Sequence, residues 1–207
     1  FRSWVWGQYE LRYLNAPDEL RGYNPLWVNA HHLKRGRLRR GGLTCGDVTF
    51  RTLYVDVAYL DAEALKVLLK LARQGFPICM KQRPLEPGRR PTRRYAAMLD
   101  QLLAQPSVAA DFHPPGALRP YVTGDSLPDY WARRDGGDVY LFFAHPMAQG
   151  LAYPLAAGQS WTTATRHIPV TFHRGGKATP CTLTFQPYQS LLIRLRADGG
   201  VEPVDIT

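Results

Sequence analysis

The first half of the chain alternates short apolar runs with segments of helical periodicity. The apolar runs predict strands at 50–58 (FRTLYVDVA), 76–81 (FPICMK) and 107–112 (SVAADF). The helical periodicity falls between them, at 60–75 and 92–105, and earlier in the chain at 23–35. Strand–helix–strand–helix–strand with short connections predicts a parallel sheet with helices packed against its faces.

Capping residues mark the ends of these predicted helices. Asp61 is the expected N-cap of the second helix, which ends before Gly75, and Thr92 is the expected N-cap of the third. For the first helix we expect Asn24 as the cap, with Pro25 at the first helical position. Glycine-rich turns in the segment GRLRRGGLTCGDVTF (36–50) then predict a hairpin.

Beyond about residue 113 the periodicity is that of strands alone. Alternating or aromatic runs separated by glycine turns cover 129–134, 137–145, 167–174, 179–186 and 190–197. They predict antiparallel pairs with one buried face. The expected fold class is therefore α/β plus all-β, a parallel-sheet domain followed by a β-sandwich-like module. We divide the chain into an irregular segment 1–24, an α/β domain 25–115 and a β module 116–207.

The charge of the chain raises the question of an anionic partner. Its 207 residues carry a formal net charge of +9, and positive residues, mostly arginines, cluster at 33–40 and 83–94. However, these clusters lack interleaved aromatic residues, and no nucleic-acid-binding motif accompanies them. We keep nucleic-acid binding as a less favoured alternative. No apolar run reaches the roughly 18 residues that a membrane span requires, and the initial Phe1 suggests a segment of a longer polypeptide.

Motifs for cofactors, metals and nucleophiles are missing from the sequence. Three separated cysteines and six histidines show no metal-ligand spacing, and no phosphate-binding or nucleophile-elbow pattern occurs. We therefore expect no catalytic residue, metal or cofactor in this chain. Asp56 and Asp61 lie around the end of a predicted strand, where they could face a ligand, but loop and cap roles explain them better.

Two carboxylates and two tryptophans are the remaining candidates for ligand contacts. Asp125 and Asp129 are close together in TGDSLPDYW, beside Trp131, and Trp161 follows in a later loop. Paired carboxylates serve glycoside hydrolysis, and aromatic rings stack on sugars. Asp residues are also common in turns, which is the alternative interpretation of Asp125 and Asp129. We take Asp125, Asp129, Trp131 and Trp161 as candidate sugar contacts.

Several segments resemble the C-terminal region of large bacterial glycosidases related to the family 106 α-L-rhamnosidases. The resemblance rests on YNPLWVNAHHLKRGRLRRGGLTCGDVTFRTLYV, on DAEALKVLLKLARQGFPICMKQRPLEPG, and on the closing segments GDVYLFFAHPMAQGLAYPLAAGQSW and GGKATPCTLTFQPYQSLLIRL. It covers about three quarters of the chain and depends on the order and spacing of these segments.

The resemblance implies a modular enzyme whose catalytic carboxylates belong to an upstream barrel. This chain would then supply a flavodoxin-like or amidotransferase-like domain and a terminal β module, both non-catalytic, in a periplasmic or extracellular protein. None of the family's catalytic positions has a counterpart here. Two alternatives stay open. One is a stand-alone carbohydrate-binding module that uses exposed aromatics, and the other is a small hydrolase that uses Asp56, Asp125 or Asp129.

Overall fold

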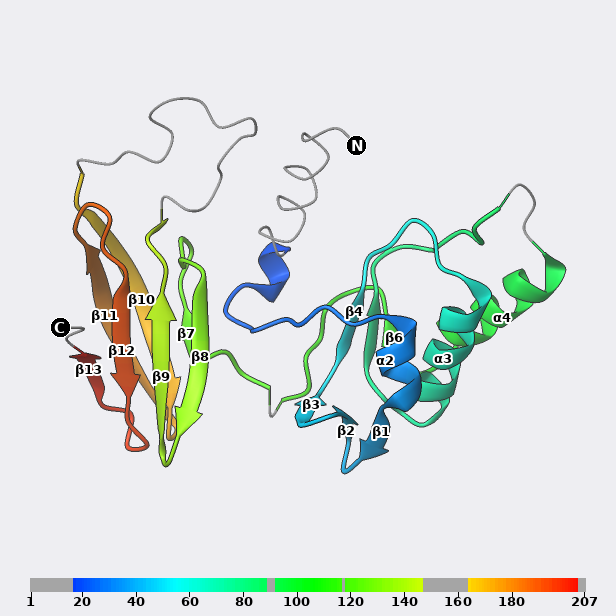
Figure 1. Cartoon of the computed structure of the whole chain (residues 1–207), viewed down its shortest axis with the longest axis horizontal. Coiled ribbons are helices and arrows are strands. Elements are labelled where there is room, and N and C mark those ends of the chain that lie inside the picture. Colours follow the sequence, from blue (N-terminus) through cyan, green and yellow to red (C-terminus); the bar gives the residue numbers. More distant parts are fainter. Residues whose placement is uncertain (1–16, 89–91, 117, 147–163, 205–207) are drawn as a thin grey trace. The chain divides into compact units, whose positions relative to one another are not determined.

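A computed structural model describes residues 17–88, 92–116, 118–146 and 164–204. These residues form two compact units (Figure 1). The α/β unit comprises 26–118, and the β unit comprises 119–204 together with 17–25. The order predicted from the sequence, α/β first and β afterwards, is confirmed in this coarse form.

The α/β unit begins with a short helix and a three-stranded antiparallel meander. The elements are α2 (Ala30–Arg35), β1 (Arg37–Arg39), β2 (Gly42–Cys45) and β3 (Val48–Phe50). The predicted hairpin is confirmed, but the predicted helix start is wrong. Asn29, in extended backbone conformation, is the N-cap, and its side chain accepts from the His32 N–H at 3.1 Å. The segment from Asn24 and Pro25 to Asn29 is not helical.

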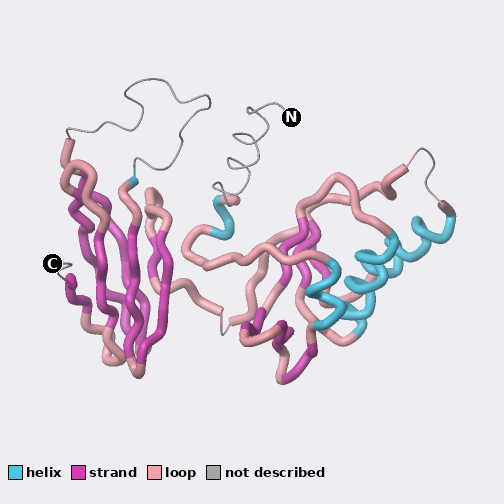
Figure 2. Tube along the Cα trace, viewed as in Figure 1, coloured by secondary structure: helices cyan, strands magenta, loops and turns pink. Residues whose placement is uncertain are grey.

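The rest of the unit is a three-stranded parallel sheet whose strands alternate with helices (Figure 2). Its elements are β4 (Leu53–Val55), α3 (Ala62–Arg73), β5 (Ile78–Met80), α4 (Arg93–Leu103) and β6 (Val108–Ala109). The strand order β4-β5-β6 follows the chain, so two crossovers of the same hand put both helices on one face of the sheet. Consistent with this, α3 and α4 contact each other.

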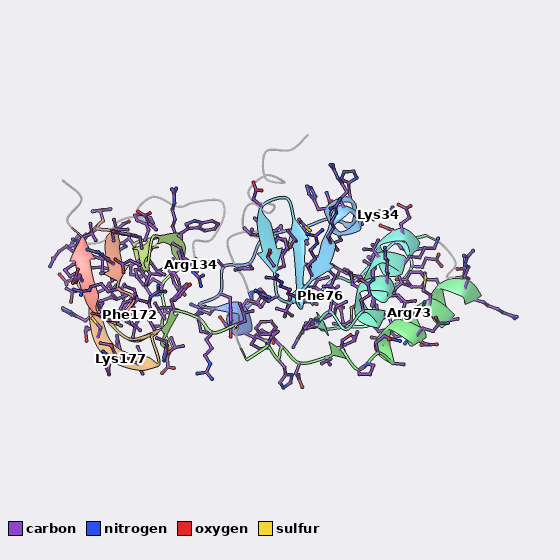
Figure 3. All side chains as sticks on the ribbon, turned by 90° about the horizontal axis from the view of Figure 1, so that it is seen from below. Lys34, Arg73, Phe76, Arg134, Phe172 and Lys177 are labelled. Carbon is purple, nitrogen blue, oxygen red and sulfur yellow. The ribbon has the colours of Figure 1, made fainter. Side chains whose placement is uncertain are left out.

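The predicted capping residues of α3 and α4 are confirmed. Asp61 accepts from the Ala64 N–H at 2.8 Å, and Thr92 accepts from the Tyr95 N–H at 3.2 Å. Each bond satisfies a backbone donor that the helix itself leaves unpaired. Behind the caps, one apolar face of each helix enters the core of the unit, where Leu65 and Leu102 are fully buried in the same cluster as Phe76. Figure 3 labels Phe76 in this unit.

The β unit consists of two antiparallel sheets packed face to face. One sheet has the order β11-β10-β7 and the other the order β13-β12-β9-β8. The strands are β7 (Val122–Thr123), β8 (Tyr130–Asp135), β9 (Asp138–Phe143), β10 (Arg166–Arg174), β11 (Lys177–Phe185), β12 (Leu191–Leu195) and β13 (Val201–Val204). Phe172 from one sheet and Phe143 from the other meet in the core with ring centroids 6.3 Å apart. Figure 3 shows Phe172 among the strands of this unit.

Glycine turns join the hairpins of the β unit. Gly136, with φ of 58°, lies between β8 and β9, and Gly175 and Gly176, also at positive φ, lie between β10 and β11. Both hairpins were predicted from these glycines. In the closing segment CTLTFQPYQSLLIRL, Pro187 lies in the turn that separates β11 from β12. These two strands belong to different sheets.

Residues 17–25 pack on the β unit, although they precede the α/β unit in the chain. The Tyr130 hydroxyl donates to the Gly22 carbonyl, and the Arg21 guanidinium donates to the Leu127 carbonyl at 3.0 Å. A Cβ at Gly22, which has φ of +86°, would lie 2.8 Å from the Val122 carbonyl oxygen. Glycine is therefore needed at this point, and the contact joins segments about a hundred residues apart in the chain.

Candidate functional site

The outer face of sheet β13-β12-β9-β8 carries a row of apolar side chains across all four strands. Trp131 pairs with Phe142, Phe142 with Leu192, and Leu192 with Val204. Alternation along each strand turns these residues away from the core, into which Val139, Leu141 and Ile193 point. We call Trp131, Phe142, Leu192 and Val204 the aromatic row. It spans three interstrand spacings, about 14 Å.

The two aromatic residues of this row are the most exposed. Trp131 exposes 58% of its surface and Phe142 exposes 43%, whereas Leu192 and Val204 are half-buried. Directly opposed side chains on one face of an antiparallel pair are close enough to touch. Trp131 and Phe142 therefore form an adjacent aromatic pair that is open to solvent.

A polar row runs parallel to the aromatic row, two residues along each strand. It consists of Arg133, Tyr140, Arg194 and Glu202, which are paired in that order. Arg194 lies 2.6 Å from the Asp138 carboxylate and 3.8 Å from that of Glu202. Arg196, just after β12, also contacts Glu202, at 3.0 Å.

These ion pairs shift the pKa values of the charged groups. The hydrogen bond from Arg194, followed by that from the Ala197 N–H, lowers the pKa of Asp138 below its ordinary value. The same hydrogen bond raises the pKa of Arg194. The sheet therefore presents an aromatic pair beside an ordered set of donors and acceptors. Such a combination suits ligands that have both apolar faces and hydroxyl groups.

The predicted site residues lie in different surroundings. Trp131 belongs to the aromatic row, and Trp161 lies outside the described residues. Asp125 lines a hollow of about 810 Å³ at the end of the β unit, with Arg21, Arg166 and His167 among its other lining residues. Neither Asp129 nor Trp131 lines this hollow. The structure thus gives Asp125 and Trp131 separate surroundings.

In the α/β unit, the acidic residues that follow the strands accept hydrogen bonds from backbone N–H groups or from a nearby side chain. Asp56 accepts from the Gln82 amide at 2.6 Å, and Glu86 accepts from the Thr92 N–H at 2.5 Å. Asp61 caps α3. The thiol of Cys79 is buried and contacts the Ala110 carbonyl at 3.5 Å. These carboxylates therefore have structural roles in the α/β unit.

Among the described residues, no group of three or more His, Cys, Asp or Glu side chains is arranged to hold a metal ion. Their helices are all too short or too polar to cross a lipid bilayer.

Sequence reasoning missed Tyr140 and Phe142 as partners of Trp131. The signal was present in GDVYLFFAH, where every position from 139 to 144 is apolar. Alternation leaves Tyr140 and Phe142 outside once Val139, Leu141 and Phe143 fill the core.

Comparison of the chain with protein-family models, with curated proteins and with solved structures found no match.

Proposed function

We propose that the chain is the non-catalytic C-terminal part of a bacterial glycoside hydrolase and that its aromatic row contacts the glycan. The observation that supports this best is the exposed pair of Trp131 and Phe142 beside the ordered polar row. Rings of this kind stack on the C–H faces of sugars, while neighbouring charged groups bond the hydroxyls. The resemblance of the sequence to family 106 glycosidases points to the same ligand class.

In this proposal the α/β unit is a reduced flavodoxin-like or amidotransferase-like domain that supports an upstream catalytic barrel. Its parallel sheet with strand order β4-β5-β6 is compatible with such a domain. The carboxylates Asp56, Asp61 and Glu86 are engaged in backbone caps and a side-chain hydrogen bond, which suits a supporting role. A secreted or periplasmic compartment follows from the same proposal.

Glycan binding by the purified chain tests the role of the aromatic row. Affinity electrophoresis against a panel of rhamnose-containing and rhamnose-free polysaccharides should show retardation that Trp131→Ala abolishes. Trp131→Tyr should retain part of it, because a ring that can stack is kept. The matched control is Trp27→Ala, which removes another exposed tryptophan, in the α/β unit. Equal loss in both variants, or binding untouched by Trp131→Ala, would refute the proposed contact.

The coding sequence that precedes the Phe1 codon tests the modular part of the proposal. An open reading frame that continues upstream into a (β/α) barrel with paired carboxylates would support it. A start codon directly before Phe1 would contradict it and leave a stand-alone carbohydrate-binding module as the function. Hydrolysis of a glycoside by the purified chain, lost in Asp125→Asn, would instead favour the small hydrolase.

A further inference from the structure

A groove runs between α3 and α4 on the surface of the α/β unit. Its volume is about 570 Å³. The lining residues are Lys66, Leu69, Lys70, Arg73 and Gln74 of α3 and the segment after it, and Arg94, Ala97, Met98 and Gln101 of α4. The two helices run in the same direction, because each connects parallel strands of one sheet. Figure 3 shows Arg73 at these helices, where it donates to Gln101 at 2.7 Å.

Both walls of this groove carry exposed cations, three on α3 and one on α4. The two helices contain one carboxylate each, and both are paired with cations outside the groove. Glu63 lies 2.8 Å from Lys34, and Asp100 lies 2.7 Å from Arg83. Within the described part of the chain, Lys66, Lys70, Arg73 and Arg94 therefore have no carboxylate in ion-pair range.

The helix dipoles stabilise only some of these cations. Lys70 and Arg73 lie in the last turn of α3, where cations favourably face the negative end of the helix dipole. Lys66 and Lys70, however, are four residues apart, a spacing at which like charges repel. Arg94 lies in the first turn of α4, which is the unfavourable end for a cation. A negatively charged partner would offset both the repulsion between Lys66 and Lys70 and the unfavourable position of Arg94.

The floor of the groove is aliphatic. Leu69 is buried, Met98 is half-buried, and Ala97 adds a small exposed side chain. From Lys66 to Arg73 the helix rises about 10 Å. Single-stranded nucleic acids bind on aromatic stacking platforms, and sugars also favour aromatic faces. This floor instead resembles the grooves into which a third helix lays its apolar stripe.

We infer that the groove between α3 and α4 docks an amphipathic helix of a partner protein, with acidic residues flanking its apolar stripe. The stripe lies over Leu69, Ala97 and Met98. Acidic residues spaced three to four positions apart on the flanks face Lys66 and Lys70 on one side and Arg94 on the other. This inference does not depend on the proposed glycan contact, which involves the β unit.

Selection from a phage-displayed library of helical peptides about four turns long tests this inference. The full chain is the bait. The selected peptides should carry an apolar stripe flanked by Glu or Asp, and fluorescence anisotropy then measures their affinity. In the variant Lys66→Glu/Lys70→Glu/Arg94→Glu the affinity should fall roughly tenfold or more, since several exposed charge pairs become repulsive. All three substitutions are on exposed positions, and circular dichroism checks the fold.

The control is Arg93→Glu, a single charge reversal on α4 next to Arg94 but outside the groove lining, and it is compared with Arg94→Glu alone. It should change the affinity by less than Arg94→Glu does. Peptides without acidic residues, equal binding to the groove variant, or no selected peptide would overturn the inference. So would tighter binding of a single-stranded DNA oligonucleotide or of polygalacturonate than of the peptides, if the groove variant abolishes that binding.

Discussion

The two units differ in their balance of positive and negative residues. Residues 26–118 contain fifteen Lys and Arg against seven Asp and Glu, whereas the rest of the chain contains eleven against ten. In the β unit, Arg21, Arg194 and Arg196 each pair with a carboxylate. Almost the whole net charge of +9 thus belongs to the α/β unit. The electrostatic attraction of a polyanion would therefore come mainly from the α/β unit, a difference that the composition of the whole chain does not show.

The units also differ in the reach of their contacts. The α/β unit pairs elements that follow one another in the chain, β4 with β5 and β5 with β6. The β unit joins β9 to β12 across a long connection and ties Gly22 to Tyr130. Contacts close in sequence form faster than distant ones. The comparison therefore predicts two cooperative units that fold at different rates, the α/β unit faster, and the following substitutions test how separate they are.

The largest effect is expected from Phe172→Ala. Phe172 is 1% exposed and packs edge-to-face on Phe143. Its truncation should lower the free energy of unfolding of the β unit by about 3–5 kcal/mol. Hydrogen exchange with mass spectrometry in urea resolves the two units. Leu65→Ala, at a fully buried position of α3, is the counterpart and should affect the α/β unit alone. A joint loss of protection in both units would show that they unfold as one body.

A smaller effect is expected from Tyr130→Phe, which tests the membership of residues 17–25. Without the hydroxyl, the Gly22 carbonyl loses its donor, which should cost the β unit about 1–3 kcal/mol. Trypsin should then cleave at Arg21 faster than in the wild-type chain. Tyr59→Phe, at an exposed position of the α/β unit, serves as the control. Unchanged cleavage would mean that the hydrogen bond does not hold this segment.

Asp61→Ala tests a feature that belongs to the α/β unit alone. Loss of the cap bond to the Ala64 N–H should lower the stability of that unit by about 1 kcal/mol. Asp61→Ser should retain most of the stability because a serine hydroxyl also accepts from the helix. Urea denaturation followed by circular dichroism at a helical wavelength measures both variants. Equal loss in the alanine and serine variants would assign another role to the carboxylate.

The capping residues also show what the sequence could predict. Asp61, Thr92 and Gly75 act locally, so α3 and α4 were predicted with nearly correct ends. The same logic failed at the first helix, because Asn24 and Asn29 are residues of the same type and the local pattern does not decide which of them caps the helix. The turn glycines Gly136 and Gly175 likewise predicted hairpins, since positive φ is a local property.

The candidate surfaces depend on pairings that no local pattern encodes. Trp131 meets Phe142 through a hairpin, but Leu192 joins them only because β12 pairs with β9. The hollow around Asp125 brings in Arg166, which lies about forty residues further along the chain. A sequence pattern could nominate Trp131 and Asp125 singly, and it could not say which neighbours each would have.

The smallest effect is expected from Asp138→Asn, and it appears as a change in pH dependence. Arg194 lowers the pKa of Asp138 in the folded β unit, so the carboxylate contributes stability above its unfolded pKa of about 4. This contribution is lost as the pH falls through the lower folded value. The wild-type β unit should therefore lose stability in acid more steeply than the Asn variant, and the α/β unit should respond identically in both chains. Thermal unfolding between about pH 2 and pH 6, a window around these pKa values, measures the difference. If the β units of the wild-type chain and of the Asn variant had parallel pH profiles, the ion pair with Arg194 would stabilise neither the strand pairing nor the polar row beside Trp131.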